Sequence, residues 1–254
     1  MLADLLTGVL TGICRFAGLR FAICHLSFVI CSLLIALAFA VVDWVAVARR
    51  RKGLEYVFKP ATLVAVIVGA ALLTQGPHDA WQARFFLAGL VFSLAGDVFL
   101  MLPEATEGKP RPYFLLGLVS FLLGHVCYVV GLNPTLPPAL ALVAFVVVAA
   151  IGVTLYRAIA AGLRRQGQEA MKMPVAVYSV VLSLMLFSAW ATLFRPEWTP
   201  VRRGLVIAGA SLFFGSDAML AWDRFVRRSP LLHLMVIITY HLGQMALAAS
   251  ISLW

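Results

Sequence analysis

The chain has 254 residues, of which 63% are hydrophobic and 12% charged, and its mean hydropathy is +0.98. A water-soluble domain carries about a quarter charged residues, so this composition excludes an ordinary soluble domain. The net charge of +9 does not indicate a nucleic-acid partner, because the basic residues stand in short runs between long apolar blocks. Such runs are typical of the loops that orient a membrane protein.

Eight apolar stretches of about 20 residues predict an all-α fold, a polytopic transmembrane helical bundle, because helices satisfy their own backbone hydrogen bonds in lipid. No connecting segment is long enough to separate two domains, so residues 26–254 are expected to form one domain. Residues 1–25 are expected to be an N-terminal extension of unknown role, without a cleaved signal. The predicted spans cover residues 26–48, 60–75, 82–102, 112–132, 138–158, 172–193, 203–222 and 231–252.

The distribution of Lys and Arg predicts the orientation of these spans. Fourteen of the 20 basic residues fall in or beside the loops after the first, third, fifth and seventh spans. By the positive-inside rule, these loops lie in the cytoplasm and both termini lie outside.

Two acids, Asp97 and Asp217, lie inside apolar spans. An ionised carboxyl at this depth is costly unless it is paired or wetted, so an acid there indicates a functional site. A low-dielectric setting favours the protonated form, which is the form that a general acid needs. The alternative is a structural acid paired to a neighbouring helix, and Asp43 is interpreted in that way.

Both acids lie five residues before the end of their predicted spans, roughly 8 Å from the cytoplasmic ends. Tyr178 falls in the same layer, and Lys59 is predicted to lie at the cytoplasmic mouth of the second span. Each acid also follows small residues, Gly96 before Asp97 and Gly215-Ser216 before Asp217, which predicts close helix approach. Three spans are thus expected to place polar groups together near a basic rim.

Other polar residues have weaker signals. His125 is either a packing histidine or part of the cavity wall, and the same choice holds for the face formed by Tyr240 and Gln244. The glycines at positions 117, 124 and 131 predict a stripe for close helix packing. The cysteines at positions 14, 24, 31 and 127 are interpreted as small core residues.

No metal or other cofactor is expected, because the histidines show no ligand spacing along one helix. A distributed metal site using His125, His241 and the two aspartates is the alternative that the sequence leaves open. Asp97 and Asp217 lie 120 residues apart, and each has Leu three residues later. A tandem duplication of four spans would produce this pattern.

At these motifs the chain resembles the YhhN-like family, the lysoplasmalogenases. Two features depart from the family pattern: residues 1–25 have no counterpart, and His241 stands where an aromatic residue is more usual. The matching motifs are Lys59-Pro60, Phe92-Ser93-Leu-x-Gly96-Asp97-x-x-Leu100, Gly117-x-x-Ser120-Phe121-x-x-Gly124-His125-x-x-Tyr128, Tyr178 with Met185, Gly209-Ala210-x-Leu212-Phe213-x-x-Ser216-Asp217 with Arg224-Phe225, and Thr239-Tyr240-x-x-x-Gln244.

This resemblance implies hydrolysis of the vinyl ether bond of lysoplasmenyl-ethanolamine or -choline, giving a fatty aldehyde and a glycerophospho-ethanolamine or -choline. It also implies a multi-pass protein of a bacterial inner membrane. A protonated acid and a carboxylate suit vinyl ether hydrolysis, and the sequence does not say which aspartate is the proton donor. The implied catalytic residues are Asp97 and Asp217. The implied substrate-binding residues are Lys59, Ser93, His125, Tyr128, Tyr178, Ser216, Tyr240 and Gln244, with Lys59 attracting the phosphate.

Two other functions use the same residues. A proton-coupled transporter of lipids or small molecules would use the aspartates as a proton relay and release no product. A lipid-binding protein would keep its affinity when either aspartate is replaced by asparagine. The sequence leaves headgroup preference and oligomeric state open.

Overall fold

The computed structural model describes residues 27–73, 80–102 and 112–251, so the predictions for residues 1–25 lie outside the described part. Within that part it is helical, without a strand, and eight helices are long and apolar enough to cross a membrane. The predicted class, an all-α bundle of eight spans, is therefore confirmed.

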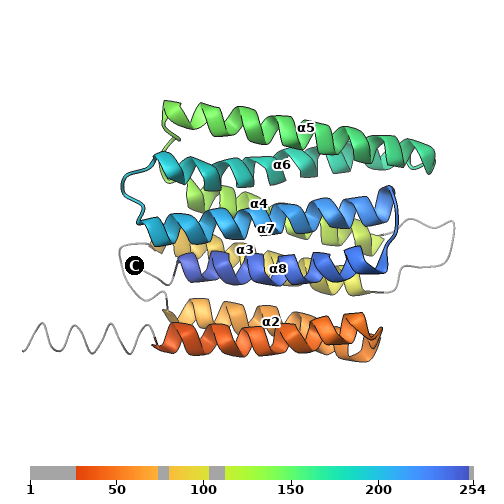
Figure 1. Ribbon diagram of the computed structural model, residues 1–254, viewed down its shortest axis with the longest axis horizontal. Coiled ribbons are helices and arrows are strands. Elements are labelled where there is room, and N and C mark those ends of the chain that lie inside the picture. The colour runs from red at the N-terminus through yellow and green to blue at the C-terminus, as the bar shows by residue number, and fades with distance from the viewer. Residues whose placement is uncertain (1–26, 74–79, 103–111, 252–254) are drawn as a thin grey trace, which may run out of the picture.

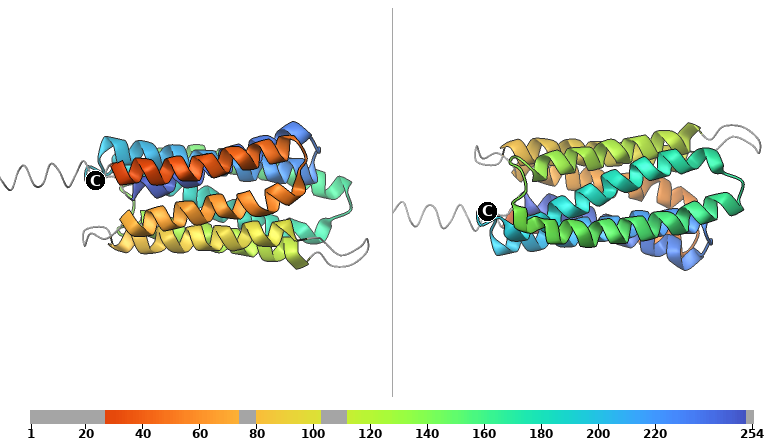
Figure 2. Two further views of the ribbon diagram at one scale, coloured as in Figure 1. Left: turned by 90° about the horizontal axis from the view of Figure 1, so that it is seen from below. Right: turned by 90° about the horizontal axis from the view of Figure 1, so that it is seen from above.

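The helices run along one common axis (Figure 1). The first helix and α2 lie at one edge of the bundle, and α5 lies at the opposite edge (Figure 2). Three short 3₁₀ turns, Ala139–Ala141, Glu169–Met171 and Thr192–Phe194, join the later helices. The helices are the first helix (Ser27–Ala48), α2 (Lys52–Leu73), α3 (Ala80–Met101), α4 (Pro112–Leu132), α5 (Leu142–Arg165), α6 (Lys172–Ala191), α7 (Pro200–Phe225) and α8 (Pro230–Ser250).

The start of α2 differs most from the prediction. The sequence places the start at Pro60, but the helix begins at Lys52 and contains Pro60 in its interior. Its first turn includes an ion pair between Lys52 and Glu55, with 3.0 Å between Nζ and Oε2. Polar residues thus extend the helix beyond its apolar block, and Lys59 lies about two turns inside it rather than at its mouth.

The end of α5 also lies beyond its predicted position, residue 158, because the helix continues to Arg165. Gly167 then adopts a left-handed conformation with φ of +68°. The N–H of Gln168 donates to the carbonyl of Leu163, and that of Gly167 donates to Arg164. These two bonds form a Schellman motif. The motif ends the helix with a left-handed conformation that only glycine adopts readily.

Close packing at glycine joins α3 to α4. A Cβ atom at Gly124 would lie 3.1 Å from the carbonyl oxygen of Gly89, and one at Gly131 would lie 2.9 Å from the Phe86 ring. The predicted stripe on α4 is therefore a packing surface. Gly96 is equally constrained, because its Cβ would lie 2.6 Å from Phe121, but Gly215 has nothing within 4 Å. The prediction of close approach at Gly215 is wrong.

Opposite the basic loops, a buried arginine joins the α4–α5 and α6–α7 connections. Arg195 donates to the side chain and carbonyl of Thr135 at 3.0 and 2.8 Å, and to Asn133 Oδ1 at 3.1 Å. Asn133 in turn donates to Ser188 Oγ at 2.7 Å. This network fixes the end of the bundle opposite the basic loops, while the predicted site lies at the other end.

Candidate active site

A cavity of about 330 Å³ opens at the end of the bundle that carries the basic loops. Its inner wall contains both acids predicted from the sequence, Asp97 from α3 and Asp217 from α7. We call this the polar cavity. Its other polar lining residues are Lys52, Glu55, Tyr56, Lys59, Ser216, Asp223, Arg224, Arg228, His233 and Tyr240.

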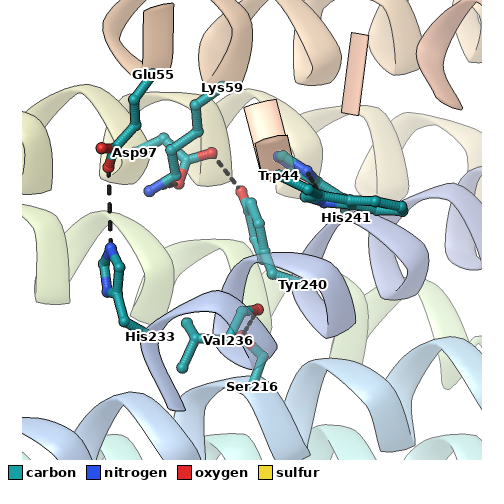
Figure 3. Close-up of polar contacts among 9 residues, drawn as sticks. All are labelled: Trp44, Glu55, Lys59, Asp97, Ser216, His233, Val236, Tyr240 and His241. Carbon is teal, nitrogen blue, oxygen red and sulfur yellow. Dashed lines mark hydrogen bonds and ion pairs between the residues drawn. The ribbon is translucent and has the colours of Figure 1, made fainter. Parts of the chain in front are cut away.

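Asp97 is fully buried and faces hydrogen-bond donors. Lys59 Nζ lies 3.0 Å from Asp97 Oδ1, and the hydroxyl of Tyr240 donates to Oδ2 at 2.7 Å (Figure 3). The lysine comes from α2 and the tyrosine from α8, so three helices meet at this carboxyl. An ammonium and a hydroxyl donor both stabilise an ionised carboxylate. The arrangement around Asp97 therefore suits the charged form.

Asp217 has a different kind of neighbour. The hydroxyl of Tyr178 donates to Asp217 Oδ2, and His125 Nε2 lies 3.4 Å from the same oxygen. His125 Nδ1 lies 2.5 Å from the carbonyl oxygen of Phe121, which can only accept a hydrogen bond. In a neutral imidazole this leaves Nε2 as an acceptor. A carboxylate and Nε2 are both acceptors, so a favourable contact requires a proton between Asp217 and His125.

A second, narrower cavity of about 60 Å³ lies between α4, α5, α6 and α7. Its walls are mostly apolar, with polar side chains from Tyr178, Ser179, Asp217 and Arg224, and we call it the apolar cavity. Asp217 and Phe121 line both cavities, whereas Asp97 lines the polar cavity. Asp217 thus stands where an apolar space meets a polar one. The apolar side includes Leu118, Leu155, Ile159, Val175 and Leu182.

The structure brings together most of the residues predicted for the site. Lys59, Ser216 and Tyr240 line the polar cavity, Tyr178 lines the apolar cavity, and His125 contacts Asp217. Ser216 also donates to the carbonyl of Val236 at 2.9 Å, which links α7 to α8 (Figure 3).

Three predicted residues lie elsewhere. Tyr128 donates to Gln244 Oε1 at 2.7 Å, a buried bond between α4 and α8 outside both cavity walls. Ser93 is buried at the α3–α4 interface beside Gly124. These three positions support the packing of the helices that carry the acids.

The sequence did not identify the rim of the polar cavity. Glu55 faces His233, with 4.0 Å between Oε1 and Nε2 (Figure 3). Glu55 and Lys52 precede the predicted second span, so they were assigned to a loop. Their spacing of three residues suits an ion pair within one helical turn, and this spacing was the signal that could have placed both residues on a helix.

Two further buried polar residues, His241 and Asp43, do not line the polar cavity. Trp44 donates to His241 Nδ1 at 3.1 Å, and the two rings stack (Figure 3). This bond joins the first helix to α8 and gives His241 a packing role. Asp43 is fully buried, with neither carboxyl oxygen hydrogen-bonded, and it is not part of the polar cavity wall.

No group of three or more His, Cys, Asp or Glu side chains suited to a metal ion occurs among the residues that the structure describes. His125 and His241 each serve a separate contact, the first with Asp217 and the second with Trp44.

Comparisons with known proteins agree with this picture. The mouse (Mus musculus) protein named Lysoplasmalogenase TMEM86B is 30% identical over 190 residues, covering 74% of this chain and 71% of that protein. The human (Homo sapiens) Lysoplasmalogenase TMEM86A is 30% identical, covering 66% of this chain and 65% of that protein. The Lysoplasmalogenase of Mycobacterium tuberculosis is also 30% identical, covering 64% and 58%.

The chain thus spans less than two thirds of the length of some of the curated relatives that it matches. No solved structure matches it significantly. The sequence profile of the YhhN family matches residues 54–251, which include every lining residue of both cavities except Lys52. The chain belongs to the YhhN family.

Proposed function

We propose that this protein is a lysoplasmalogenase that hydrolyses the vinyl ether bond of lysoplasmenyl-ethanolamine or -choline. The observation that carries the proposal is the place of Asp217, at the junction of the polar and apolar cavities and in the same polar cavity as Asp97. In such a lipid the vinyl ether is itself the junction between the hydrocarbon chain and the polar glycerol. A substrate that fills both cavities presents this bond to both acids.

The surroundings of the two acids support different catalytic roles for them. Protonation of a vinyl ether occurs at the β-carbon, which is the chain-side carbon of the double bond. Asp217, which lines the apolar cavity and lies 3.4 Å from His125 Nε2, is the proposed donor to that carbon. Asp97, held ionised by Lys59 and Tyr240, is the proposed base on the glycerol side. A pair with separate proton states is the usual arrangement for acid–base catalysis.

The proposed reaction restores the starting protonation state of both acids. Asp217 protonates the β-carbon, and the resulting oxocarbenium-like cation is stabilised by the carboxylate of Asp97. Water adds to the α-carbon while Asp97 accepts its proton, giving a hemiacetal. The hemiacetal hydroxyl then returns a proton to Asp217 as the carbon–oxygen bond to glycerol breaks, and Asp97 protonates the departing alcohol. The products are a fatty aldehyde and the glycerophospho-base.

The rim of the polar cavity suits a zwitterionic headgroup. Lys52 and Arg228 are basic, Glu55 is acidic, and all three line the opening. The phosphate can pair with the exposed Arg228, and the amine can pair with Glu55 if it displaces Lys52 from their ion pair. Lys59 lies deeper and is engaged by Asp97. We therefore assign phosphate attraction to the rim rather than to Lys59.

The eight apolar helices make this a multi-pass integral membrane protein. We place it in the bacterial inner membrane with the basic loops and the mouth of the polar cavity in the cytoplasm, and with both termini outside. The substrate then lies in the cytoplasmic leaflet. Its headgroup is at the rim and its chain points toward the bilayer centre.

The decisive experiment measures aldehyde release from lysoplasmenyl-ethanolamine by the purified protein, beside the saturated ether lysolipid. Asp97→Asn and Asp217→Asn are expected to lose activity by orders of magnitude while remaining folded. Asp43→Asn is the matched control, because it makes the same change at a buried acid outside the cavity wall. Release that survives in either cavity variant would refute the two-acid site. A folded wild type that releases no aldehyde would favour the proton-coupled transporter instead.

A further inference from the structure

A third space lies on the lipid side of α5 and α6. It has a volume of about 360 Å³ and an almost wholly apolar lining that includes Phe145, Ala149, Gly152, Ser179, Ser183 and Phe187. We call it the α5–α6 groove. Two further lining residues, Val153 and Val180, are 57% and 60% exposed, so the groove is open to the surroundings of the bundle. In a membrane those surroundings are lipid.

The α5–α6 groove adjoins the apolar cavity. Ser179 lines both spaces, and it directly follows Tyr178, whose hydroxyl contacts Asp217. On α6 the groove then extends to Phe187, about 12 Å further along the helix axis. This direction leads away from the basic end of the bundle and past the middle of α6, which ends at Ala191. The polar cavity, the apolar cavity and the α5–α6 groove thus follow one another in this order.

The apolar cavity alone is too small for a long hydrocarbon chain. Its volume of about 60 Å³ has room for only a short segment beside Asp217. A chain whose first carbons lie there must continue elsewhere, and Ser179 lies on the wall that leads to the groove. The lining of the groove has the apolar character that a hydrocarbon chain requires.

We propose that the α5–α6 groove is the binding site for the hydrocarbon chain of the lysolipid, and that the chain enters it sideways from the bilayer. The inference rests on the proposed function for the identity of the reacting bond, and it adds the path and the place of the chain. Because the groove is open to lipid, the chain never has to leave an apolar medium. The headgroup stays at the rim while the chain slides between the helices toward Asp217.

The test compares two neighbouring alanines of α5. Ala149→Phe places a ring in the groove, and Ala150→Phe places the same ring at an exposed position that is not part of the groove lining. The quantity measured is kcat/KM for a long-chain lysoplasmenyl-ethanolamine relative to a short-chain one. In Ala149→Phe this ratio is expected to fall on the order of tenfold, the size of discrimination that small changes in apolar pockets produce. Ala150→Phe is expected to keep the wild-type ratio.

An unchanged ratio in Ala149→Phe, or an equal fall in both variants, would overturn the proposal. A second measurement is independent of catalysis. A saturated ether lysolipid with a photoreactive group at its chain end is crosslinked to the wild-type protein, and the labelled peptides are identified. Labelling of α5 and α6 around Ala149 and Ser183, reduced in Ala149→Phe, supports the groove even if no aldehyde is released. Labelling spread over all lipid-facing helices would mean bulk lipid contact only and would refute it.

Discussion

The ion pair between Lys59 and Asp97 makes a sharp prediction, because both side chains are buried. The lysine side chain is 12% exposed, the aspartate is 1% exposed, and 3.0 Å separates their charged atoms. Lys59→Met removes the ammonium and leaves the carboxylate with the Tyr240 hydroxyl as its hydrogen-bond donor. Removing one member of a buried pair costs about 3–5 kcal/mol, because the other charge is left uncompensated. For a chain of this size that corresponds to a fall in Tm of roughly 6–20 °C.

The companion variant Lys59→Met/Asp97→Asn removes both charges and is expected to recover most of the lost stability. Replacing a whole buried pair by neutral groups is often close to neutral. Thermal unfolding in lipid-supplemented detergent gives Tm, and aldehyde release is measured on the same samples. Activity is expected to be lost in both variants, whereas stability is expected to fall in the single variant and to recover in the double variant. The reasoning fails if Lys59→Met keeps the wild-type Tm, or if the double variant is no more stable than the single one.

Two further predictions concern packing and the second donor. Gly162→Ala is expected to destabilise the bundle by about 1–3 kcal/mol, because the added Cβ would lie 2.2 Å from the carbonyl oxygen of Phe225. Thermal unfolding measures this loss. Gly215→Ala is the control, because a Cβ at Gly215 would have nothing within 4 Å. Tyr240→Phe removes a donor to the Asp97 carboxylate and is expected to lower kcat about 10- to 100-fold, the equivalent of a charged hydrogen bond. An unchanged kcat in Tyr240→Phe would exclude this bond from the reaction.

The general architecture could be predicted because lipid imposes strong constraints on a sequence. Apolar blocks of about 20 residues located all eight helices, and the glycine stripe on α4 correctly indicated close packing. The boundaries were less certain where polar residues continue a helix beyond the membrane. Lys52 and Glu55 extend α2 in this way, and the proline at position 60 falsely suggested a start.

The candidate site was predicted as a set of residues but not as an arrangement. The cost of a buried charge identified Asp97 and Asp217 from their positions alone. Their partners come from helices distant in the chain, so spacing could not reveal that Tyr240 faces one acid while His125 faces the other. The exposed groove between α5 and α6 was equally hidden, because lipid-facing and groove-lining residues have the same apolar composition.

The two acids are contacted from helices that are similarly placed in the order of the chain. Each acid is contacted from the helix before it, Asp97 by Lys59 of α2 and Asp217 by Tyr178 of α6. Each is also contacted by the last helix of the other half, Asp97 by Tyr240 of α8 and Asp217 by His125 of α4. The difference between the acids therefore depends largely on the partner from the preceding helix, which is a lysine for Asp97 and a tyrosine for Asp217.

This comparison predicts a strong asymmetry between two changes at Tyr178. Tyr178→Phe removes one hydrogen bond and is expected to leave a measurable part of the aldehyde release. Tyr178→Lys places an ammonium beside Asp217 and favours its carboxylate, so the proposed donor loses its proton. Activity is then expected to fall well below that of Tyr178→Phe, in protein whose thermal unfolding still shows a folded bundle. If the lysine variant releases aldehyde as fast as the phenylalanine variant, Asp217 is not the proton donor.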